Sequence, residues 1–276
     1  MGSHSHPILI LDCESKSTFG FDVFVKPQRS NPREKSIAAA ATLLRIRYRD
    51  FDHHNRKDPF EELLFILCSV QTQESSYRKT FRQLRRAFPR LSDLAAAPLR
   101  EIEKPLVPGG LYRSKGRSIR AICRRIVRLY GRLSLAPLRK LSDQDAEEML
   151  TSLPGVDLKV ARCVMLYSLA RKVFPVDTHC WRVCRRLGWV RSTKEGVCTR
   201  RDMNRLQAKI PSDLRFSLHV NLISLGREIC RSDRPRCEVC PLGGQCRTGQ
   251  RLQARGLAPP GSGRGTHRRV ASAHTR

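Results

Sequence analysis

Two residues of opposite charge, Lys159 and Asp177, have the types and spacing most suited to chemistry. Lys159 follows a Pro154-Gly155 turn between two helical patterns, and Asp177 comes 18 residues later, after a break at Pro175. A lysine near a helix N-terminus and many cations loses its proton more easily, and its neutral amine is a nucleophile. A carboxylate at a helix N-cap stays ionised and can stabilise a developing cation. We therefore expect a lowered pKa for Lys159 and a charged Asp177.

The helical patterns on both sides of Pro154-Gly155 predict a helix-hairpin-helix. The first pattern covers residues 142–152, with Ser142 placed as N-cap, and the second covers residues 158–170. Successive backbone amides at such a turn can bind one phosphate group. Helical pairs that only pack together have the same outline. The turn alone therefore leaves DNA binding open.

The overall charge predicts a polyanionic partner. The chain has 276 residues, with 53 Lys and Arg against 25 Asp and Glu, so its formal net charge is +28. Nucleic acid is the simplest partner for such an excess. An anionic membrane surface is the alternative, but the sequence has no apolar run of about 18 residues to support it.

Four cysteines near the C-terminal end form a second candidate site. Cys230, Cys237, Cys240 and Cys246 have the spacing C-x6-C-x2-C-x5-C. Four thiolates in so short a segment can surround one metal ion or one cluster. Zinc and an iron–sulfur cluster both remain open, although the spacing is more compact than in paired CxxC zinc modules. The chain begins without a convincing signal peptide, so we expect an intracellular protein that is not secreted.

These segments resemble the helix-hairpin-helix DNA glycosylases of the endonuclease III type. LPGVDLK (153–159), VDTH (176–179) and RVCRR (182–186) match that family's motifs, including its interval from lysine to aspartate. The resemblance implies that Lys159 is the nucleophile, that Asp177 is the activating carboxylate, and that the four cysteines hold one 4Fe–4S cluster. The family's second hairpin glycine is Asp157 here, which puts a carboxylate where a phosphate would approach.

The resemblance also implies several DNA contacts. Gln71 matches a glutamine that enters the gap left by an extruded nucleotide, and an amide can replace the lost base pairing. Leu111, in the loop GGLYRSK (109–115), matches a leucine that wedges into the duplex. Judged from the residues alone, Leu111 would pack on the core instead. The other DNA contacts that the resemblance and the charge pattern assign are Tyr112, Gly155, His179, Arg234 and Arg236.

The implied fold is all-α, with two helical domains and a DNA-binding cleft between them. Residues 59–172 are expected to form a six-helix bundle that contains the helix-hairpin-helix. Residues 36–58 and 173–247 are expected to form the second domain, which carries the iron–sulfur loop. Residues 1–35 are predicted to be an irregular arm, and residues 248–276 a disordered basic tail.

The implied function is base excision repair. The resemblance predicts a DNA glycosylase with AP (apurinic/apyrimidinic) lyase activity that removes damaged, oxidised pyrimidines through base flipping, a Lys159 Schiff base and β-elimination. It predicts double-stranded DNA as the partner, no membrane, no small-molecule cofactor, and a monomer in the bacterial cytoplasm and nucleoid or the eukaryotic nucleus.

Three alternatives remain open. The excised base could be a mismatched pyrimidine. It could also be methylated rather than oxidised, because GWV (188–190) is similar to the plant 5-methylcytosine glycosylases. The enzyme could be a monofunctional glycosylase, although the adenine-removing branch lacks a lysine at the position of Lys159. The chain could also be a noncatalytic DNA-binding protein on the same scaffold.

Overall fold

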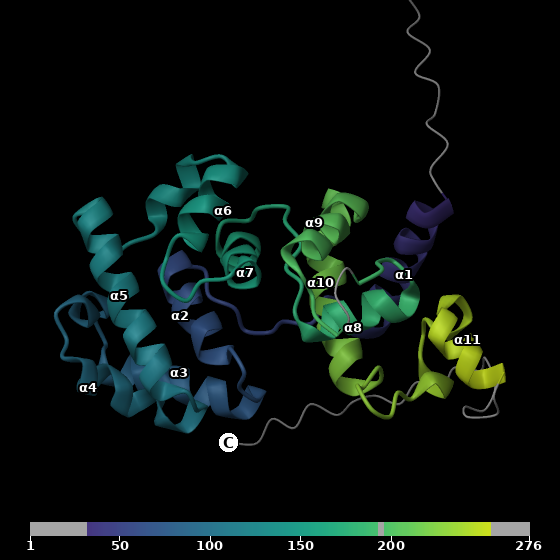
Figure 1. Ribbon diagram of the computed structural model, residues 1–276, viewed down its shortest axis with the longest axis horizontal. Coiled ribbons are helices and arrows are strands. Elements are labelled where there is room, and N and C mark those ends of the chain that lie inside the picture. The colour runs from purple at the N-terminus through teal and green to yellow at the C-terminus, as the bar shows by residue number, and fades with distance from the viewer. Residues whose placement is uncertain (1–31, 193–195, 255–276) are drawn as a thin grey trace, which may run out of the picture. The chain divides into compact units, whose positions relative to one another are not determined.

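The protein is all-α, as predicted. The computed structural model describes residues 32–192 and 196–254, and within these ranges it contains α-helices and short 3-10 helices but no β-strand (Figure 1). None of the described helices is both long enough and apolar enough to cross a bilayer. The α-helices are α1 (Pro32–Tyr48), α2 (Pro59–Ser69), α3 (Glu74–Ala87), α4 (Leu99–Glu103), α5 (Tyr112–Tyr130), α6 (Asp143–Thr151), α7 (Leu158–Ser168), α8 (Thr178–Leu187), α9 (Arg200–Lys209), α10 (Arg215–Glu228) and α11 (Arg247–Ala254).

The first hydrophobic core is enclosed by α2 to α7, and α2 is its central element. Asp58 caps α2 by accepting the backbone N–H groups of Phe60 and Glu61, and Pro59 occupies the first turn. Almost every side chain of α2 is buried, which is the pattern of a helix surrounded by other helices. Because α2 packs directly on α7, the first core fixes the helix that carries Lys159.

The second core joins segments that are far apart in the sequence. It contains side chains of α1, α8, α9 and α10 and of the loop that ends at Leu242. Helix α10 contacts both α1 and α8, and these helices lie together in Figure 1. The apolar stripe of α8, formed by Trp181, Cys184 and Leu187, is buried in this core. The division of the chain into two domains stays a prediction.

Several predicted boundaries were wrong. Helix α1 begins at Pro32 rather than at residue 36, so the end of the expected irregular arm is helical. Helix α7 ends at Ser168, because Ala170 has a positive φ of 54° and leaves the helical path. Helix α11 occupies residues 247–254, where a disordered tail was expected. The rest of the predicted arm and tail, residues 1–31 and 255–276, lies outside the described residues.

Candidate active site

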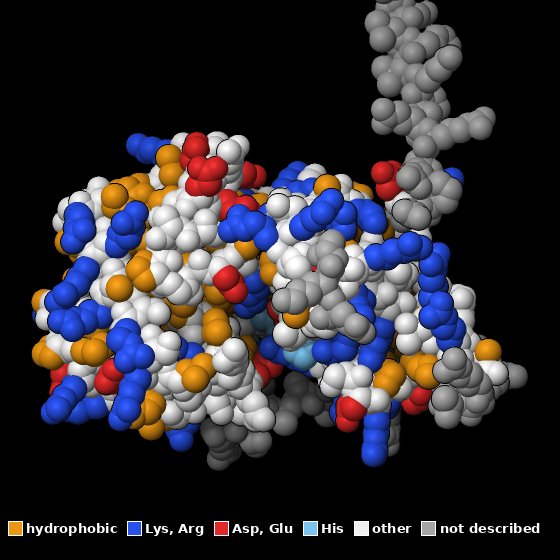
Figure 2. Space-filling view, viewed as in Figure 1, with side chains coloured by type: hydrophobic (Ala, Val, Ile, Leu, Met, Phe, Trp, Pro, Cys, Tyr) orange, Lys and Arg blue, Asp and Glu red, His pale blue; other side chains and the backbone are white. Residues whose placement is uncertain are grey.

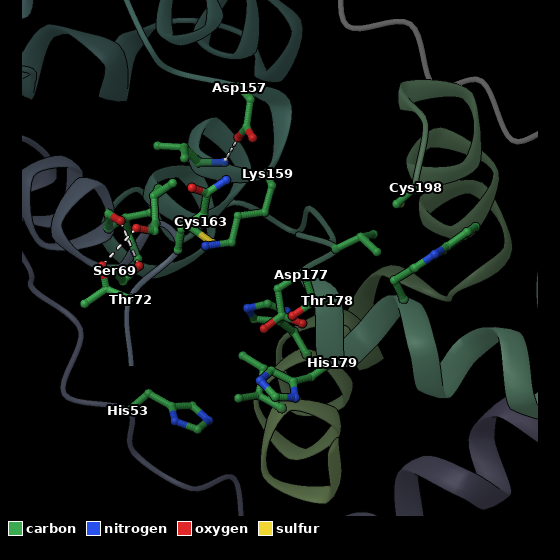
Figure 3. A pocket seen from close by; sticks show the side chains of 18 of the residues that line it. His53, Ser69, Thr72, Asp157, Lys159, Cys163, Asp177, Thr178, His179 and Cys198 are labelled. Carbon is green, nitrogen blue, oxygen red and sulfur yellow. Dashed lines mark hydrogen bonds between the residues drawn. The ribbon is translucent and has the colours of Figure 1, made fainter. Parts of the chain in front are cut away.

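A cavity of about 600 Å³ brings Lys159 and Asp177 together. Its walls include residues of α2, α7, α8 and α10, so both hydrophobic cores contribute to it. In Figure 3 the two side chains extend toward the same space, Lys159 from α7 and Asp177 from the start of α8. Figure 2 shows a hollow here with histidine at its floor and Lys and Arg side chains nearby. A cavity of this volume can enclose a ligand of nucleotide size.

The hairpin before α7 sets the position of Lys159. Gly155 has a φ of +79°, and a Cβ atom there would lie 2.7 Å from Ser118 Oγ, so both the backbone conformation and the close contact require glycine. The predicted N-cap Ser142 is confirmed on the helix before the hairpin, α6. On the helix after it, Asp157 is the N-cap and accepts the Val160 N–H at 2.8 Å. Lys159 therefore begins in the first turn of α7, half-buried in the cavity wall.

Asp177 is the N-cap of α8, as predicted. Its Oδ1 accepts the Cys180 N–H at 2.7 Å, and Gly188 ends the helix with a positive φ of 76°. Burial by itself would raise the pKa of Asp177, but the Cys180 N–H, which donates to Asp177, and the nearby Lys159 ammonium favour the carboxylate at neutral pH, and His219 and His179 add to this when they are protonated. The net pKa of Asp177 lies below the ordinary value. This residue is therefore a carboxylate at neutral pH, held at a fixed place beside the lysine.

The prediction for the charge of Lys159 was wrong. Burial by itself lowers the pKa of Lys159, as expected, but Cys163 and the carboxylates of Asp177, Asp157 and Glu62 attract the ammonium, so the net pKa is raised. Burial also raises the pKa of Cys163 to about 12, so at neutral pH this residue is a neutral thiol and the carboxylates provide the attraction. Lys159 is consequently an ammonium in the free protein and has to lose a proton before it can attack.

The histidines around Asp177 are held in fixed positions. His179 lines the cavity, and its Nδ1 lies 3.1 Å from Arg182 Nη2. A Cβ atom on Gly226 would lie 2.7 Å from His179 Cβ, so α8 and α10 can only approach this closely because residue 226 is glycine. Burial lowers the pKa of His179, and it lowers the pKa of the fully buried His219 to about 4. Both side chains are therefore neutral at neutral pH.

Gln71 and Leu111, the two residues expected to insert into the duplex, lie on two loops that hydrogen bonds connect. Both have positive φ values, 50° and 52°, and both side chains are exposed. Leu111 exposes 52% of its surface, so it does not pack on the core. Lys115 is buried between the loops and donates from Nζ to Cys68 O, Thr72 Oγ1 and Gly109 O. This link was not predicted from the sequence, although Lys115 is part of the GGLYRSK motif.

The other predicted DNA-contacting residues are spread over several elements. Tyr112 begins α5 and is half-buried, next to the exposed Leu111. Arg234 and Arg236 are exposed on the cysteine loop and are not part of the large cavity. The structure therefore places Gln71 and His179 in the cavity wall with Lys159 and Asp177, and it places these two arginines elsewhere.

The four predicted metal-binding cysteines surround a second, smaller cavity. Cys230 is buried at the end of α10, and Arg186 Nη1 lies 3.2 Å from its Sγ. The Gly249 N–H lies 3.5 Å from Cys246 Sγ. N–H groups directed at sulfur are typical around ligating thiolates, so this donor set fits a cluster. Among the described residues, these cysteines form no disulfide, and no group of His, Cys, Asp and Glu side chains is arranged to hold a single metal ion.

Sequence reasoning also missed two polar residues beside Lys159, Glu62 and Asn55. Glu62 is fully buried in α2 and accepts hydrogen bonds from Asn55 Nδ2 at 2.5 Å and from the Arg56 N–H at 2.6 Å. Asn55 lines the large cavity. The second glutamate in the otherwise apolar sequence PFEELLFILC, Glu62, could have indicated this pair. A glutamate in a buried helix needs a polar partner nearby.

The chain is similar to known base excision repair proteins. Residues 65–209 match the family described as HhH-GPD superfamily base excision DNA repair protein. The chain is 32% identical over 203 residues to endonuclease III of Bacillus subtilis (strain 168), and the match covers 72% of this chain and 86% of that protein. It is 35% identical over 191 residues to an Arabidopsis thaliana protein named as a DNA glycosylase, covering 66% of this chain and 64% of that relative. The chain thus spans slightly less than two thirds of the plant protein.

A solved structure gives the same result. The protein matches a trapped endonuclease III–DNA covalent intermediate, the estranged-adenine complex, with a TM-score of 0.69 and 27% sequence identity. The match covers 80% of this chain and 98% of that one. The similarity therefore covers most of this chain and almost all of the other.

Proposed function

Because this chain belongs to the HhH-GPD superfamily of base excision DNA repair proteins, and within it to the endonuclease III family, we propose that it excises damaged pyrimidines from double-stranded DNA and cleaves the strand. The observation that carries this proposal is the shared cavity of Lys159 and Asp177. An amine and an ionised carboxylate at one site are the two groups that base release with covalent capture of the sugar requires.

In the proposed first step, an extruded nucleotide enters the large cavity. The bond between C1′ and the base breaks, and its electron pair leaves with the base, so that positive charge develops on the sugar. The carboxylate of Asp177 stabilises this charge. The ammonium of Lys159 gives its proton to the departing base, and the neutral amine then forms a bond to C1′. Because the pKa of Lys159 is raised, the residue begins this step as an ammonium that has a proton to give.

In the proposed second step, the captured sugar loses the 3′ phosphate. The bond between C1′ and the ring oxygen O4′ then breaks and its electron pair goes to O4′, which takes up a proton that the Lys159 nitrogen has released. The bond between Lys159 and C1′ becomes the double bond of a protonated Schiff base. This cation withdraws electrons, so a base can remove a proton from C2′. The electron pair forms a double bond between C2′ and C3′, and the phosphate leaves C3′ with its oxygen. Water then hydrolyses the Schiff base and restores the amine.

Two exposed residues support extrusion in this proposal. Leu111 would enter the base stack as an apolar wedge, and Gln71 would fill the space that the nucleotide leaves. Lys115 Nζ donates to Thr72 Oγ1 on one loop and to Gly109 O on the other, so it fixes both loops relative to each other before DNA binds. This rigidity would lower the cost of ordering the loops on the duplex. The hairpin at Gly155 and the exposed Arg234 and Arg236 would contact phosphates.

We further propose that Cys230, Cys237, Cys240 and Cys246 hold one 4Fe–4S cluster. When bound, the cluster would supply a structural crosslink that fixes the loop of residues 230–246. Arg186 of α8 contacts both Cys230 Sγ and the Arg231 carbonyl, so α8 and this loop are already connected through protein atoms. The loop carries Arg234 and Arg236, and its order would decide where these cations meet the DNA backbone.

A turnover assay with defined duplexes tests the proposed function. The wild-type protein, Lys159→Ala and Asp177→Asn are each incubated with duplexes that contain thymine glycol, an abasic site, a G·T mismatch or 5-methylcytosine. We expect base release and strand cleavage on thymine glycol, and at least about a hundredfold loss of base release in Asp177→Asn. Base release without strand cleavage would indicate a monofunctional glycosylase. Tight binding with no turnover on any duplex would show a noncatalytic protein and overturn the proposal.

A further inference from the structure

Asn55, in the loop between α1 and α2, has one hydrogen-bonding atom without a partner. Its Nδ2 donates to Glu62 Oε1 at 2.5 Å, whereas its Oδ1 is buried and accepts no hydrogen bond from the described residues. Nearly all buried polar atoms in proteins are paired, so an unpaired acceptor in a cavity wall needs an explanation. Asn55 lines the same cavity as Lys159 and Cys163, whose positions Figure 3 shows.

Glu62 determines which end of the Asn55 amide meets the cavity. Both oxygens of Glu62 act as acceptors, one from Asn55 and the other from the Arg56 N–H. Turning the amide over would bring Oδ1 against a carboxylate oxygen, and the two acceptors would repel each other while Glu62 is ionised, which is above its raised pKa. Nδ2 and Oδ1 diverge from one carbon atom, so holding Nδ2 on Glu62 directs Oδ1 away from it. Glu62 does not line the cavity, and Asn55 does.

A second residue of this loop, His53, adds to the acceptor character of the wall. His53 Nε2 lies 3.0 Å from the Val220 carbonyl oxygen, which can only accept, so Nε2 carries the proton. Nδ1 of the neutral ring is then an acceptor, and it too is buried without a partner among the residues described. His53 also lines the cavity. The loop therefore combines two unpaired acceptors in one wall.

We propose that Asn55 is a specificity-determining residue whose Oδ1 accepts a hydrogen bond from an N–H group on the pairing edge of the extruded base. This inference rests on the proposed function and adds the chemical feature that the pocket recognises. A thymine-type base offers its N3–H and a cytosine-type base its N4 amino group. A site that pairs a buried acceptor with a substrate N–H rejects substrates that lack it, because the acceptor is then left unpaired.

An abasic site gives the sharpest test because it has no base for Asn55 to contact. Asn55→Ala is compared with the wild-type protein in two reactions. One is base release from whichever of the thymine glycol, G·T and 5-methylcytosine duplexes the wild type cuts fastest, and the other is strand cleavage at a preformed abasic site. We expect base release to fall at least about tenfold, while abasic-site cleavage stays within about twofold. Retained cleavage also shows that the variant is folded.

Asn221→Ala is the matched control. Asn221 is fully buried, its Nδ2 donates to Asp50 Oδ1 at 2.8 Å, and its Oδ1 has no partner in the described part of the chain, yet it does not line the cavity. This variant should change both reactions by the same factor. An equal loss of both reactions in Asn55→Ala, or unchanged base release, would overturn the assignment. If the wild type itself acts on no duplex, the proposed function fails instead.

Glu62→Gln tests the orientation of the amide. A glutamine at position 62 can donate as well as accept, so it no longer prevents Asn55 from turning its Nδ2 toward the cavity. Glu62 also helps to keep Lys159 charged, and Lys159 acts differently in the two reactions, so the effect of Asn55→Ala is measured separately in the wild-type and the Glu62→Gln background. We expect Asn55→Ala to lower the ratio of base release to abasic-site cleavage by a smaller factor when residue 62 is glutamine. An equal fall of the ratio in both backgrounds would contradict the orienting role of Glu62.

Discussion

The carboxylate of Asp157 accepts the backbone N–H of Val160 at 2.8 Å, at the N-terminus of the helix that carries Lys159. This N–H belongs to the set that a phosphate would use at a helix N-terminus. An acidic side chain therefore occupies part of the proposed phosphate-binding position of the hairpin, and its charge also raises the pKa of Lys159 together with the other nearby carboxylates.

Removing the charge of Asp157 should strengthen DNA binding. Asp157→Asn keeps an oxygen that can cap α7 and removes a negative charge from the expected path of the DNA backbone. We expect duplex affinity to rise by about three- to tenfold at low salt, with the difference shrinking as salt increases. Fluorescence anisotropy over a salt series measures this. Asp58→Asn, which alters the N-cap of α2 outside the cavity, should bind like the wild type, and equal gains in both variants would refute the role of Asp157.

The free energy of unfolding should decrease as pH rises, because Glu62 loses a proton in the folded protein. Burial raises the pKa of Glu62 from 4.5 to about 7. Between these values the folded protein holds a proton that the unfolded chain has released, so its stability decreases as pH rises through this window. A pKa shift is equivalent to roughly 1.4 kcal/mol per pKa unit, so the free energy of unfolding should decrease by about 3 kcal/mol across this window.

Urea unfolding at several pH values checks this expectation. The free energy of unfolding of the wild type, relative to that of Glu62→Gln, should decline between pH 4.5 and pH 7 and then level off. Glu148→Gln, at an exposed position of α6, should follow the wild type throughout. A constant difference between wild type and Glu62→Gln at all pH values would show that Glu62 does not titrate in this window.

Leu111 should contribute most to base release when the target base has to be extruded from a fully stacked duplex. Leu111→Ala removes the exposed wedge, and we expect base release to fall about tenfold or more from a fully paired duplex. The loss should be smaller when the target lies opposite an abasic site, because extrusion is then less costly. Leu129 is 49% exposed near the C-terminus of α5, the helix that begins directly after Leu111, so Leu129→Ala is a matched control that should retain full activity. Similar losses in both leucine variants would contradict the wedge assignment.

Cys237→Ser should abolish cluster binding. The wild-type protein is expected to contain about four iron atoms and four sulfides per chain, and both should fall toward zero in the variant. Cys123 is buried in the first core, far from the cysteine loop in sequence, so Cys123→Ala should keep its iron and sulfide. Elemental analysis and a sulfide assay measure these contents. One zinc atom per chain with no iron would show that the site is a zinc site.

Local features were predictable because one stretch of sequence contains both partners. The N-caps Asp58, Ser142 and Asp177 each bond to an amide two or three residues away, and the helix C-termini at Gly131 and Gly188 depend on a single glycine. Such interactions can be inferred from the order of the residues alone.

The properties of the site that depend on several elements were not predictable. The pKa of Lys159 was expected to be lowered, but Asp177 and Glu62, which lie on other elements, attract its charge. The hydrogen bond of Asn55 to Glu62 joins a loop to a buried helix, and no spacing rule indicates it. The motifs indicated which residues are reactive, but their protonation states depend on the tertiary packing.

Covalent trapping on DNA tests the central claim most directly. The protein is incubated with a duplex containing an abasic site in the presence of borohydride, which reduces a Schiff base to a stable amine, and the crosslinked peptide is mapped by mass spectrometry. The account predicts an adduct on Lys159 in the wild type and none in Lys159→Ala, whereas Lys172→Ala, at an exposed position after α7, should trap normally. An undiminished adduct in Lys159→Ala, or an adduct mapped to another residue of the wild type, would contradict it.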